Sequence, residues 1–494
     1  LIGGLTIALG VLIAVSAPSA GASRNVAAAL TARQRAQLVW QQKLDRMVAR
    51  GLHPARALLA PTRAPRVPRV TAQNAKQISK DTFPPVSYSQ VDTQVEPDIN
   101  VDPNNTQHIT AVFQQSRYED GGSVDPGYAT SQDGGAHWTR GNLPNLTTQV
   151  GGPYDRASDP AVAFGPDGSV YAITIAFDVS CPNAVGVQRS DDGGLTFNDP
   201  VFPQVDGCSA FNDKEWITVD TFLGSPHYGR VYATWDRLEC GQPIQLRYSD
   251  DRGATWSSLI TVSGTCTSGI GVIPLVHSNG DLTLVYESFD NGDNMVSQTS
   301  HNGGVTFDPQ VQINSFQGSG PPDMRTGGLV TATIDPVTGY MYAGWQDARF
   351  RSDGTNDIVL SRSTNGGQTW GPLTVVNQDP ETDGLDHLTP DVSAYGGYVH
   401  VDYYTRQKTN GTYTLKVNER YIVSSDNGTT FGGELVLGPA INLTYAAQGG
   451  GYFLGDYQGI AAYSAGAHAV WERSSKPPIQ ETYHQVTWSA TLVN

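Results

Sequence analysis

The chain has 494 residues, of which 38% are hydrophobic and 16% charged, enough apolar material for a large folded core. It carries 31 Lys and Arg residues against 47 Asp and Glu residues, so its formal net charge is −16 at pH 7. This acidic balance excludes nucleic acid as the expected partner, because a phosphate backbone repels an acidic surface.

Residues 1–24 are predicted to form a secretory signal peptide. The apolar run LIGGLTIALGVLIAV is followed by the small-residue contexts Ala-Pro-Ser-Ala and Ala-Gly-Ala, which are typical of cleavage sites. A retained membrane anchor is the alternative for the same run. No later stretch of the sequence is apolar enough to span a bilayer. We therefore expect a secreted, extracellular or envelope-associated protein without membrane contact after cleavage.

Residues 25–84 are predicted to form a short helical segment followed by a proline-rich linker. The run AAALTARQRAQLVWQQKLDRMVAR places apolar residues at helical spacing. Pro54, Pro61, Pro65 and Pro68 then interrupt any regular structure. The segment is locally basic, and we interpret it as a solvated spacer.

Residues 85–494 are predicted to form one all-β domain. This part is rich in Gly, Thr, Tyr, Val and Asp, with short alternating strands and frequent turn signals. A pattern of two apolar strands joined by a turn occurs seven times, for example in AVAFGPDGSVYAITIAFD and ATIDPVTGYMYAGWQDAR. One large toroid accounts for this length better than several sandwiches.

A polar octet recurs along this domain. SQDGGAHW, SDDGGLTF, SDDRGATW, SHNGGVTF, STNGGQTW and SSDNGTTF begin at Ser131, Ser190, Ser249, Ser300, Ser363 and Ser424, about 51 to 63 residues apart. This spacing suits one four-stranded sheet per repeat and favours propeller blades. The Asp or Asn and the glycines predict a tight turn, and the final aromatic ring is expected to be buried between sheets.

The octets resemble the Asp-box (BNR) repeat, Ser-x-Asp-x-Gly-x-Thr-Trp/Phe, of the sialidase superfamily of β-propellers. This resemblance implies a propeller of four-stranded blades and an exo-sialidase-like glycoside hydrolase acting on terminal sugars. In that superfamily the box lies on the face opposite the ligand site. We therefore expect Asp192 and Asp251 to staple turns rather than to take part in catalysis.

The number of blades is predicted to be seven, because seven strand pairs accompany the six octets. A six-bladed, sialidase-like ring is the alternative, with the first or last unit outside the ring. The terminal segments VSYSQVDTQV and ETYHQVTWSATLV are available to complete the outermost sheets, which would remove exposed sheet edges.

The four cysteines occupy equivalent places in successive repeats. Cys181 and Cys208 lie in one repeat, and Cys240 and Cys266 lie in the next. Of the three possible connectivities, only Cys181–Cys208 with Cys240–Cys266 treats both repeats alike. A metal site is the competing interpretation, but the sequence has no Cys-x-x-Cys pair, and disulfides suit an exported chain.

One face of the predicted ring gathers charged side chains. The connection into each first strand and the turn after each second strand lie on the face away from the octets, where functional loops are expected. These places hold Glu96, Asp98, Arg117, Arg156, Asp159, Asp213, Lys214, Glu215, Arg237, Glu287, Asp323, Arg325, Arg349, His387, Arg406, Asp456 and Tyr457.

Roles follow from the chemistry that the resemblance implies: an arginine cluster that binds a carboxylate, a Tyr nucleophile assisted by Glu, and an Asp acid/base. The predicted catalytic residues are Asp98, Asp213, Glu287 and Tyr457. The predicted substrate-binding residues are Arg156, Arg237, Arg325, Arg349, Arg406 and Asp456. The predicted partner is a glycan or polysaccharide.

Other interpretations of this face remain open at this point. The Phe-Arg-Ile-Pro segment that carries the first arginine in sialidases is absent, which favours a non-catalytic propeller that binds glycan or protein. A polysaccharide lyase acting on uronate polymers is a further alternative, with Tyr457, His387 and Arg325 supplying base and cation. In the exits W-D-R, W-Q-D-A-R and W-E-R, the arginines are equally suited to structural acid–arginine pairs.

No cofactor is expected to be required, and we expect a monomer. The loops RSDGTND near Asp353 and DNGDN near Asp293 offer oxygen ligands for a structural Ca²⁺. They lack the ligand spacing of an EF-hand loop, and such loops are more often plain turns.

Overall fold

The computed structural model describes residues 70–494, except 327 and 479–480. The predicted signal peptide and the predicted N-terminal helix lie outside these residues. Within them the structure is all-β, with 3-10 turns at η2 (Thr148–Val150), η3 (Ala348–Phe350) and η4 (Leu443–Tyr445). No helix among the described residues is long and apolar enough to cross a membrane.

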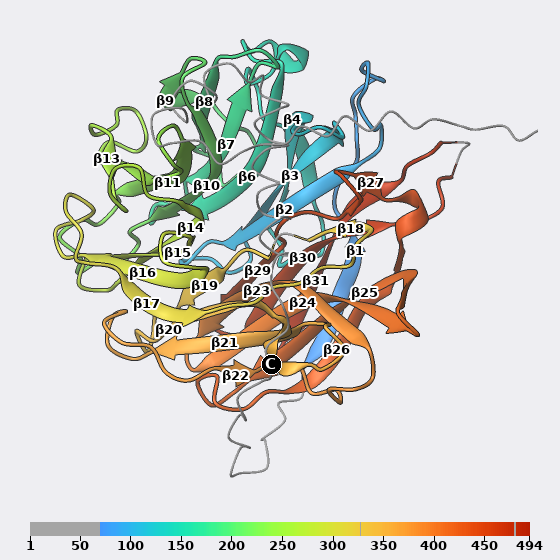
Figure 1. The fold of residues 1–494 in the computed structure, drawn as a ribbon. Coiled ribbons are helices and arrows are strands. Elements are labelled where there is room, and N and C mark those ends of the chain that lie inside the picture. The colour runs from blue at the N-terminus through green and yellow to red at the C-terminus, as the bar shows by residue number, and fades with distance from the viewer. Residues whose placement is uncertain (1–69, 327, 479–480) are drawn as a thin grey trace, which may run out of the picture.

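Antiparallel units of four strands follow one another along the chain (Figure 1), and the pairing of Ser123 with Ala157 joins the first two units into one eight-stranded sheet. In chain order their strands are β2 (Gln94–Val101), β3 (Ile109–Arg117), β4 (Ser123–Ser131) and β5 (Thr139–Asn142); β6 (Arg156–Phe164), β7 (Val170–Phe177), β8 (Asn183–Ser190) and β9 (Val201–Asp206); β10 (Phe211–Val219), β11 (Val231–Leu238), β12 (Ile244–Ser249) and β13 (Ile260–Thr261); β14 (Gly269–Val276), β15 (Leu282–Ser288), β16 (Asn294–Ser300) and β17 (Val311–Ser315); β19 (Thr331–Ile334), β20 (Met341–Asp347), β21 (Asp357–Ser363) and β22 (Thr374–Val375); and β23 (Leu385–Tyr395), β24 (Tyr398–Thr409), β25 (Thr412–Ser424) and β26 (Gly432–Asn442).

The last sheet joins the two ends of the described chain. Its strands are β29 (Gly459–Tyr463), β30 (Gly466–Ser474), β31 (Gln485–Val493) and β1 (Thr71–Gln77), and β1 pairs antiparallel with β31. Strand β1 precedes residue 85, where the sequence analysis places the start of the domain. Its polar sequence TAQNAKQ suits an outermost strand, which is solvated on one edge.

The first strands of the sheets form a closed ring. Strand β2 contacts β6, β6 contacts β10, β10 contacts β14, β14 contacts β19, β19 contacts β23, β23 contacts β29, and β29 returns to β2. This arrangement is that of a β-propeller, in which every inner strand is flanked by two others. A small sheet of β18 (Met324–Arg325), β27 (Ala447–Gln448) and β28 (Tyr452–Phe453) lies beside the ring.

Large aromatic side chains on the second strands fill the space between sheets. Trp235 of β11, Trp345 of β20 and Trp471 of β30 have no exposed surface. Each packs in a core cluster with residues of the preceding sheet, for example Trp235 with Ile173 and Ile175 of β7. A side chain of this size buries about 150–250 Å². The repeated Trp therefore holds neighbouring sheets together.

The octets lie directly after the third strands of six sheets. In the octet that begins at Ser249, Ser249 Oγ accepts the amide N–H of Gly253 at 2.8 Å and donates to Asp251 Oδ1 at 2.8 Å. The same carboxylate accepts the Thr255 amide at 2.8 Å. The octet is thus a closed hydrogen-bonded turn, the structural role expected from its sequence.

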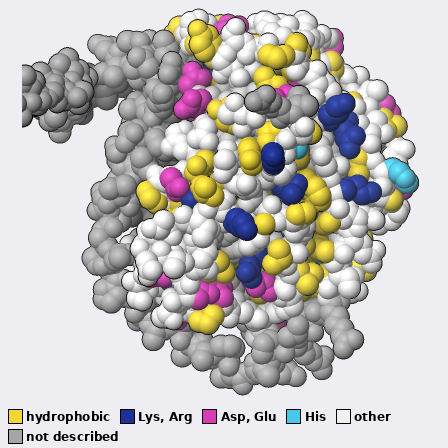
Figure 2. Space-filling view, turned by 90° about the vertical axis from the view of Figure 1, so that its right-hand side faces the viewer, with side chains coloured by type: hydrophobic (Ala, Val, Ile, Leu, Met, Phe, Trp, Pro, Cys, Tyr) yellow, Lys and Arg dark blue, Asp and Glu magenta, His cyan; other side chains and the backbone are white. Residues whose placement is uncertain are grey.

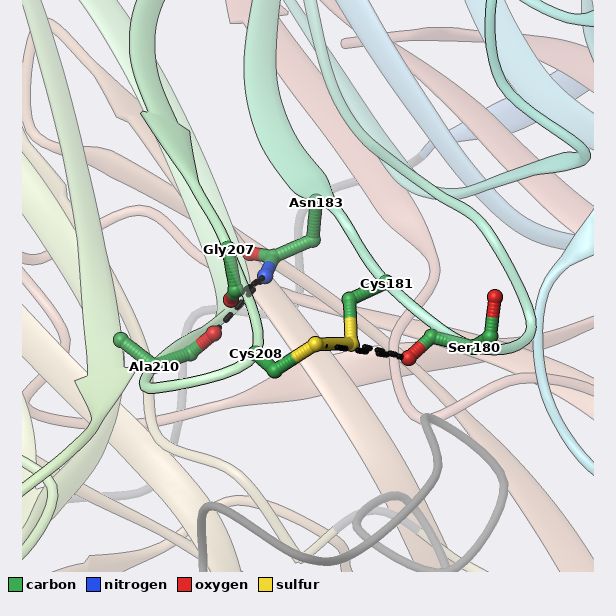
Figure 3. Close-up of a disulfide and its surroundings, with 6 residues drawn as sticks. All are labelled: Ser180, Cys181, Asn183, Gly207, Cys208 and Ala210. Atoms are coloured by element: carbon green, nitrogen blue, oxygen red, sulfur yellow. Dashed lines mark hydrogen bonds between the residues drawn. A yellow bond between two sulfur atoms is a disulfide. The ribbon is translucent and has the colours of Figure 1, made fainter.

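Both predicted disulfides are present. Cys181 is bonded to Cys208 and Cys240 to Cys266, with Cα–Cα distances of 5.4 and 4.5 Å. Figure 3 shows the first bridge beside Asn183, whose side-chain amide donates to the Ala210 carbonyl at 2.8 Å. The bridge therefore fixes the loop after β7 to the segment that leads into β10.

Removing the first bridge is expected to destabilise the fold. The Cys181→Ser/Cys208→Ser double variant frees a loop of 27 residues in the unfolded chain, which lowers the free energy of unfolding by roughly 3 to 4 kcal/mol. The measurement is the midpoint of guanidinium unfolding. The Cys240→Ser/Cys266→Ser variant should lower the midpoint by a similar amount, since its loop has nearly the same size. An unchanged midpoint in both variants would contradict the prediction.

The surface mixes apolar and basic groups despite the acidic composition. On the face drawn in Figure 2, Lys and Arg side chains are interspersed with hydrophobic ones. Many arginine side chains of the described residues are paired with carboxylates, for example Arg156 with Asp120 and Arg237 with Asp206.

Candidate functional site

A cavity of about 690 Å³ opens where the first strands of several sheets begin. This volume is typical of small-ligand sites. An apolar wall lines one side, including Ile175 and Phe177 at the end of β7 and Phe211 at the start of β10. The charged side chains that line it are Glu96, Arg117, Glu119, Asp120, Arg156, Asp159, Asp213, Lys214, Arg325 and Asp456.

A repeated β-bulge aims side chains into this cavity. The register of each first strand shifts at Glu96 in β2, at Asp159 in β6 and at Lys214 in β10. These residues have positive φ angles of 55°, 53° and 42°, which is uncommon for residues other than glycine. Bulges and such strained backbone occur preferentially at functional sites. The same local distortion thus brings three charged side chains from successive sheets together.

Three carboxyl groups form a hydrogen-bonded row in the cavity. Asp159 lies between Glu96 and Asp213 and is hydrogen-bonded to both. Ser158 Oγ donates to Asp159 Oδ1 at 3.0 Å, and the Gln114 amide donates to Ser158 Oγ at 3.0 Å and to Glu96. The row therefore has a fixed orientation.

Burial and mutual repulsion hold protons in this row at neutral pH. Burial, then the charge of Asp159, raises the pKa of Asp213 to about 8. Burial, then Asp159, also raises the pKa of Glu96 well above its usual range. A carboxylic acid that keeps its proton near pH 7 is suited to general acid catalysis.

Two arginines lie beside the carboxyl row and share one aromatic ring. The guanidinium carbons of Arg117 and Arg325 lie 4.5 and 4.6 Å from the centroid of Phe453. Arg325 Nε donates to Asp456 Oδ1 at 3.1 Å. Arg117 Nη1 donates to the neutral Gln114 Oε1 at 2.9 Å, while its buried Nε has no hydrogen-bond partner among the described residues. Arg117 therefore lies within electrostatic range of Glu96, Asp159 and Asp456 but makes no hydrogen bond to a carboxylate among the described residues.

Lys214 forms the floor between this cavity and a smaller one of about 20 Å³. Its ammonium lies 3.6 Å from the centroid of the Tyr457 ring and 4.4 Å from that of Trp216. It has no hydrogen-bond partner in the part of the chain that the structure describes. A buried cation over two rings is stabilised by cation–π attraction. Lys214 thus places positive charge behind the carboxyl row.

Four of the predicted site residues line the large cavity: Asp213, Arg156, Arg325 and Asp456. Arg156 lies at the rim, where Nη1 donates to Asp120 Oδ1 at 2.8 Å and the guanidinium stacks 3.9 Å from the centroid of the Tyr118 ring. Arg325 and Asp456 form an ion pair.

Asp98, Glu287 and Tyr457, which the sequence analysis expects to be catalytic, do not line the large cavity. Asp98 Oδ2 accepts the backbone N–H of Val162 at 2.7 Å and so joins the first two sheets. Glu287 is buried in β15. Tyr457 is 7% exposed, and its hydroxyl donates to the Pro160 carbonyl at 2.8 Å.

The remaining predicted arginines lie in acid–arginine pairs, as the structural alternative expects. Arg237 Nη2 lies 2.7 Å from Asp206 Oδ1, Arg349 Nε donates to Asp347 Oδ1 at 2.9 Å, and Arg406 Nη1 donates to Asp323 Oδ1 at 2.7 Å. None of these three arginines lines the cavity. Arg237 and Arg406 fasten the ends of second strands to neighbouring segments, whereas Arg349 is bonded to Asp347 at the end of its own strand.

Tyr457→Phe is expected to keep kcat within about threefold of the wild-type value. Burial raises the pKa of Tyr457 well above its usual range, so its phenol stays protonated at neutral pH. Its hydroxyl is bonded to a backbone carbonyl rather than directed into the cavity. Steady-state kinetics checks this expectation. A loss of a hundredfold or more would show that Tyr457 reaches the substrate.

Glu96, Arg117, Asp159 and Lys214 occupy the charged face in the sequence analysis but receive no role there. Glu96, Asp159 and Lys214 converge because of the bulges at the starts of their first strands, and Arg117 joins them from the end of β3. Glu96 and Asp159 both precede a proline, in Glu-Pro-Asp and Asp-Pro-Ala, at the same place in successive repeats. This shared proline could have predicted the bulges from the sequence, because proline in a strand often marks a bulge.

Within the described residues, no group of three or more His, Cys, Asp or Glu side chains is placed to hold a metal ion. In the Asp353 loop, Asp353 Oδ1 accepts the amide N–H and the hydroxyl of Thr355 at 3.0 and 2.6 Å. These contacts are those of a plain turn.

No protein-family model and no curated protein matches the sequence. Solved structures do match. A protein of unknown function from Dyadobacter fermentans is 14% identical, with 86% of this chain and 100% of that chain covered and a TM-score of 0.45. A Hadza microbial sialidase is 16% identical over 64% of each chain, with a TM-score of 0.46. An ulvan lyase is 11% identical over 81% of this chain and 97% of that chain, with a TM-score of 0.46. At this level of similarity, these structures carry no argument about the reaction.

Proposed function

We propose that the protein is a secreted, monomeric carbohydrate-active enzyme, a glycoside hydrolase that removes terminal sugars from glycans or polysaccharides in an exo-sialidase-like manner. The observation that carries the proposal is the row Glu96–Asp159–Asp213 inside a cavity beside two arginines, where burial raises the pKa of Asp213 to about 8. The ring of first strands and the sheets attached to it support a seven-bladed propeller as its scaffold.

Asp213 is the proposed general acid. Its proton passes to the glycosidic oxygen as the bond to the terminal sugar breaks, which stabilises the leaving group. Asp159 is the proposed nucleophile, beside the sugar carbon that develops positive charge, because its direct contact with Asp213 leaves no space for the water that an inverting base would activate. Glu96 holds Asp159 in place through their shared hydrogen bond.

Arg117 and Arg325 are the proposed binding site for an acidic group on the terminal sugar. A guanidinium binds a carboxylate through two parallel hydrogen bonds. Two like charges over one ring repel each other, and a bound anion relieves that repulsion. Asp456 orients Arg325 for this contact.

The test is turnover by the purified protein on a panel of aryl glycosides, sialosides and uronate polysaccharides. Release of a terminal sugar from at least one member is expected. Absence of turnover on every member, with a folded protein by circular dichroism, would refute the proposal.

A non-catalytic glycan-binding propeller is the second candidate. It is favoured by the pairing of rim arginines with carboxylates, since Arg156–Asp120 and Arg325–Asp456 already neutralise much of the positive charge. Saturable binding on a glycan array without product would support it, and product formation would exclude it.

A further inference from the structure

An exposed aromatic ring stands at the rim of the large cavity. Tyr88 lines the cavity although its side chain is 93% exposed. A fully solvated large ring beside a deep site contributes nothing to the core. A ligand whose apolar face covers this ring would gain free energy from the area that it buries.

The backbone holds Tyr88 in this exposed position. Its φ angle is 69°, a left-handed conformation that is unfavourable for a bulky residue. The next residues fix the turn, because Ser89 N donates to the Val86 carbonyl at 3.0 Å and Gln90 N donates to the Arg117 carbonyl at 2.7 Å. Strain that is maintained by neighbouring bonds is typical of ligand-binding segments.

A glycine shelf adjoins Tyr88 on the same rim. The Gln90 side-chain amide donates to the Gln448 carbonyl at 2.8 Å, and Gln448 N donates to Gln90 Oε1 at 2.6 Å. These bonds place Gly449 and Gly450, which also line the cavity, next to the Tyr88 turn. Glycine lets a ligand approach the backbone closely. Gly449 and Gly450 thus present backbone to the cavity beside Tyr88, with the Phe453 ring packed against Gly449.

Glu119 adds a negative charge to this part of the rim, where the neighbouring Arg156 is paired with Asp120. Ser89 pairs with Tyr118, and the following residue, Glu119, is exposed and lines the cavity. A carboxylate accepts hydrogen bonds from sugar hydroxyls but repels a uronate or a sulfate ester. This rim therefore selects against a second acidic sugar.

We propose that Tyr88 and the shelf Gly449–Gly450 form an outer subsite that binds an uncharged sugar ring next to the terminal sugar in the cavity. The apolar face of the ring stacks on Tyr88, and its hydroxyls contact the shelf and Glu119. The proposal rests on the proposed function and narrows it. The substrate is an oligosaccharide or glycan whose penultimate sugar is neutral, rather than a polymer of consecutive uronates.

The test compares two substrates with the same terminal sugar, a methyl glycoside and a neutral tetrasaccharide. Tyr88→Ala should raise KM for the tetrasaccharide about tenfold with kcat unchanged, and should leave KM for the methyl glycoside within twofold. Tyr88→Trp should retain tetrasaccharide binding. Leu223→Ala is the matched control, because Leu223 is also highly exposed but does not line the cavity. Equal KM values for the tetrasaccharide in wild type and Tyr88→Ala would overturn the proposal.

A charge-neutralisation arm tests selectivity for an uncharged ring. Glu119→Gln should lower KM for a tetrasaccharide that carries a uronate in the penultimate position and should not change KM for the methyl glycoside. If wild type cleaves no glycan, the proposed function fails, and saturation-transfer NMR with the neutral tetrasaccharide then tests the subsite alone. In that experiment, loss of the signal in Tyr88→Ala supports the subsite, and an equal signal in both proteins refutes it.

Discussion

Asp213→Asn is expected to lower kcat about 10²- to 10⁴-fold while the protein remains folded. The amide cannot donate a proton to the leaving oxygen, and general acid catalysis contributes a factor of this size. Its side chain has nearly the same shape and keeps a hydrogen-bond contact with Asp159. The measurement is steady-state kinetics on the substrate that wild type cleaves best, together with a melting curve.

The pH dependence gives this prediction a second readout. Because the pKa of Asp213 is raised to about 8, the acid is protonated below that pH, and turnover should fall as pH rises through about 8. The unfolded chain loses this proton near the usual value of 3.8, so the folded state binds more protons between about pH 4 and 8. Stability should therefore decrease with rising pH across this range, less steeply in Asp213→Asn.

Asp251→Asn is the control for Asp213→Asn. Asp251 lies in an octet turn, away from the cavity, and there it accepts the Thr255 amide. Its replacement should leave kcat unchanged. A normal kcat in Asp213→Asn, or an equal loss in both variants, would contradict the assignment of Asp213.

Arg117→Gln is expected to raise KM for an acidic substrate by about a hundredfold. The glutamine removes a buried positive charge that no carboxylate neutralises through a hydrogen bond among the described residues. Truncating one partner of a buried charged contact costs about 2 to 5 kcal/mol in binding. For a neutral substrate of the same enzyme, the change in KM should be small, since such a substrate has no acidic group that could contact Arg117.

Arg349→Gln provides the matched control for Arg117→Gln. Arg349 donates a hydrogen bond to Asp347 and does not line the cavity. Its replacement should therefore leave KM unchanged for acidic and for neutral substrates. If Arg117→Gln changes KM for both substrates equally, Arg117 does not recognise an anion.

The repeating parts of the molecule were predictable from sequence because each repeat gives the same local signal. The octets predicted the turns after the third strands, and the equivalent positions of Cys181 and Cys240 predicted both bridges. The repeats can be aligned with one another, so a residue type that recurs at the same place in each repeat indicates a shared structural role. It did not reveal β1, because TAQNAKQ has no apolar alternation and pairs with β31 at the far end of the chain.

The site was only partly predictable, because its geometry depends on backbone details that sequence spacing does not fix. Counting positions placed Asp98 and Asp213 alike at the starts of first strands. The bulge at Glu96 turns Glu96 into the cavity and leaves Asp98 bonded to the next strand. Likewise, Arg325 and Arg406 are both predicted to bind substrate, yet only Arg325 lines the cavity, while Arg406 at the end of β24 is bonded to Asp323.

The most direct test of the account is a crystal structure of Asp213→Asn soaked with the preferred oligosaccharide. The account predicts the terminal sugar in the cavity, with its glycosidic oxygen within hydrogen-bond distance of residue 213, its acidic group against Arg117 and Arg325, and the next sugar stacked on Tyr88. A sugar bound on the octet face, or in the cavity with its glycosidic oxygen away from the carboxyl row, would contradict it.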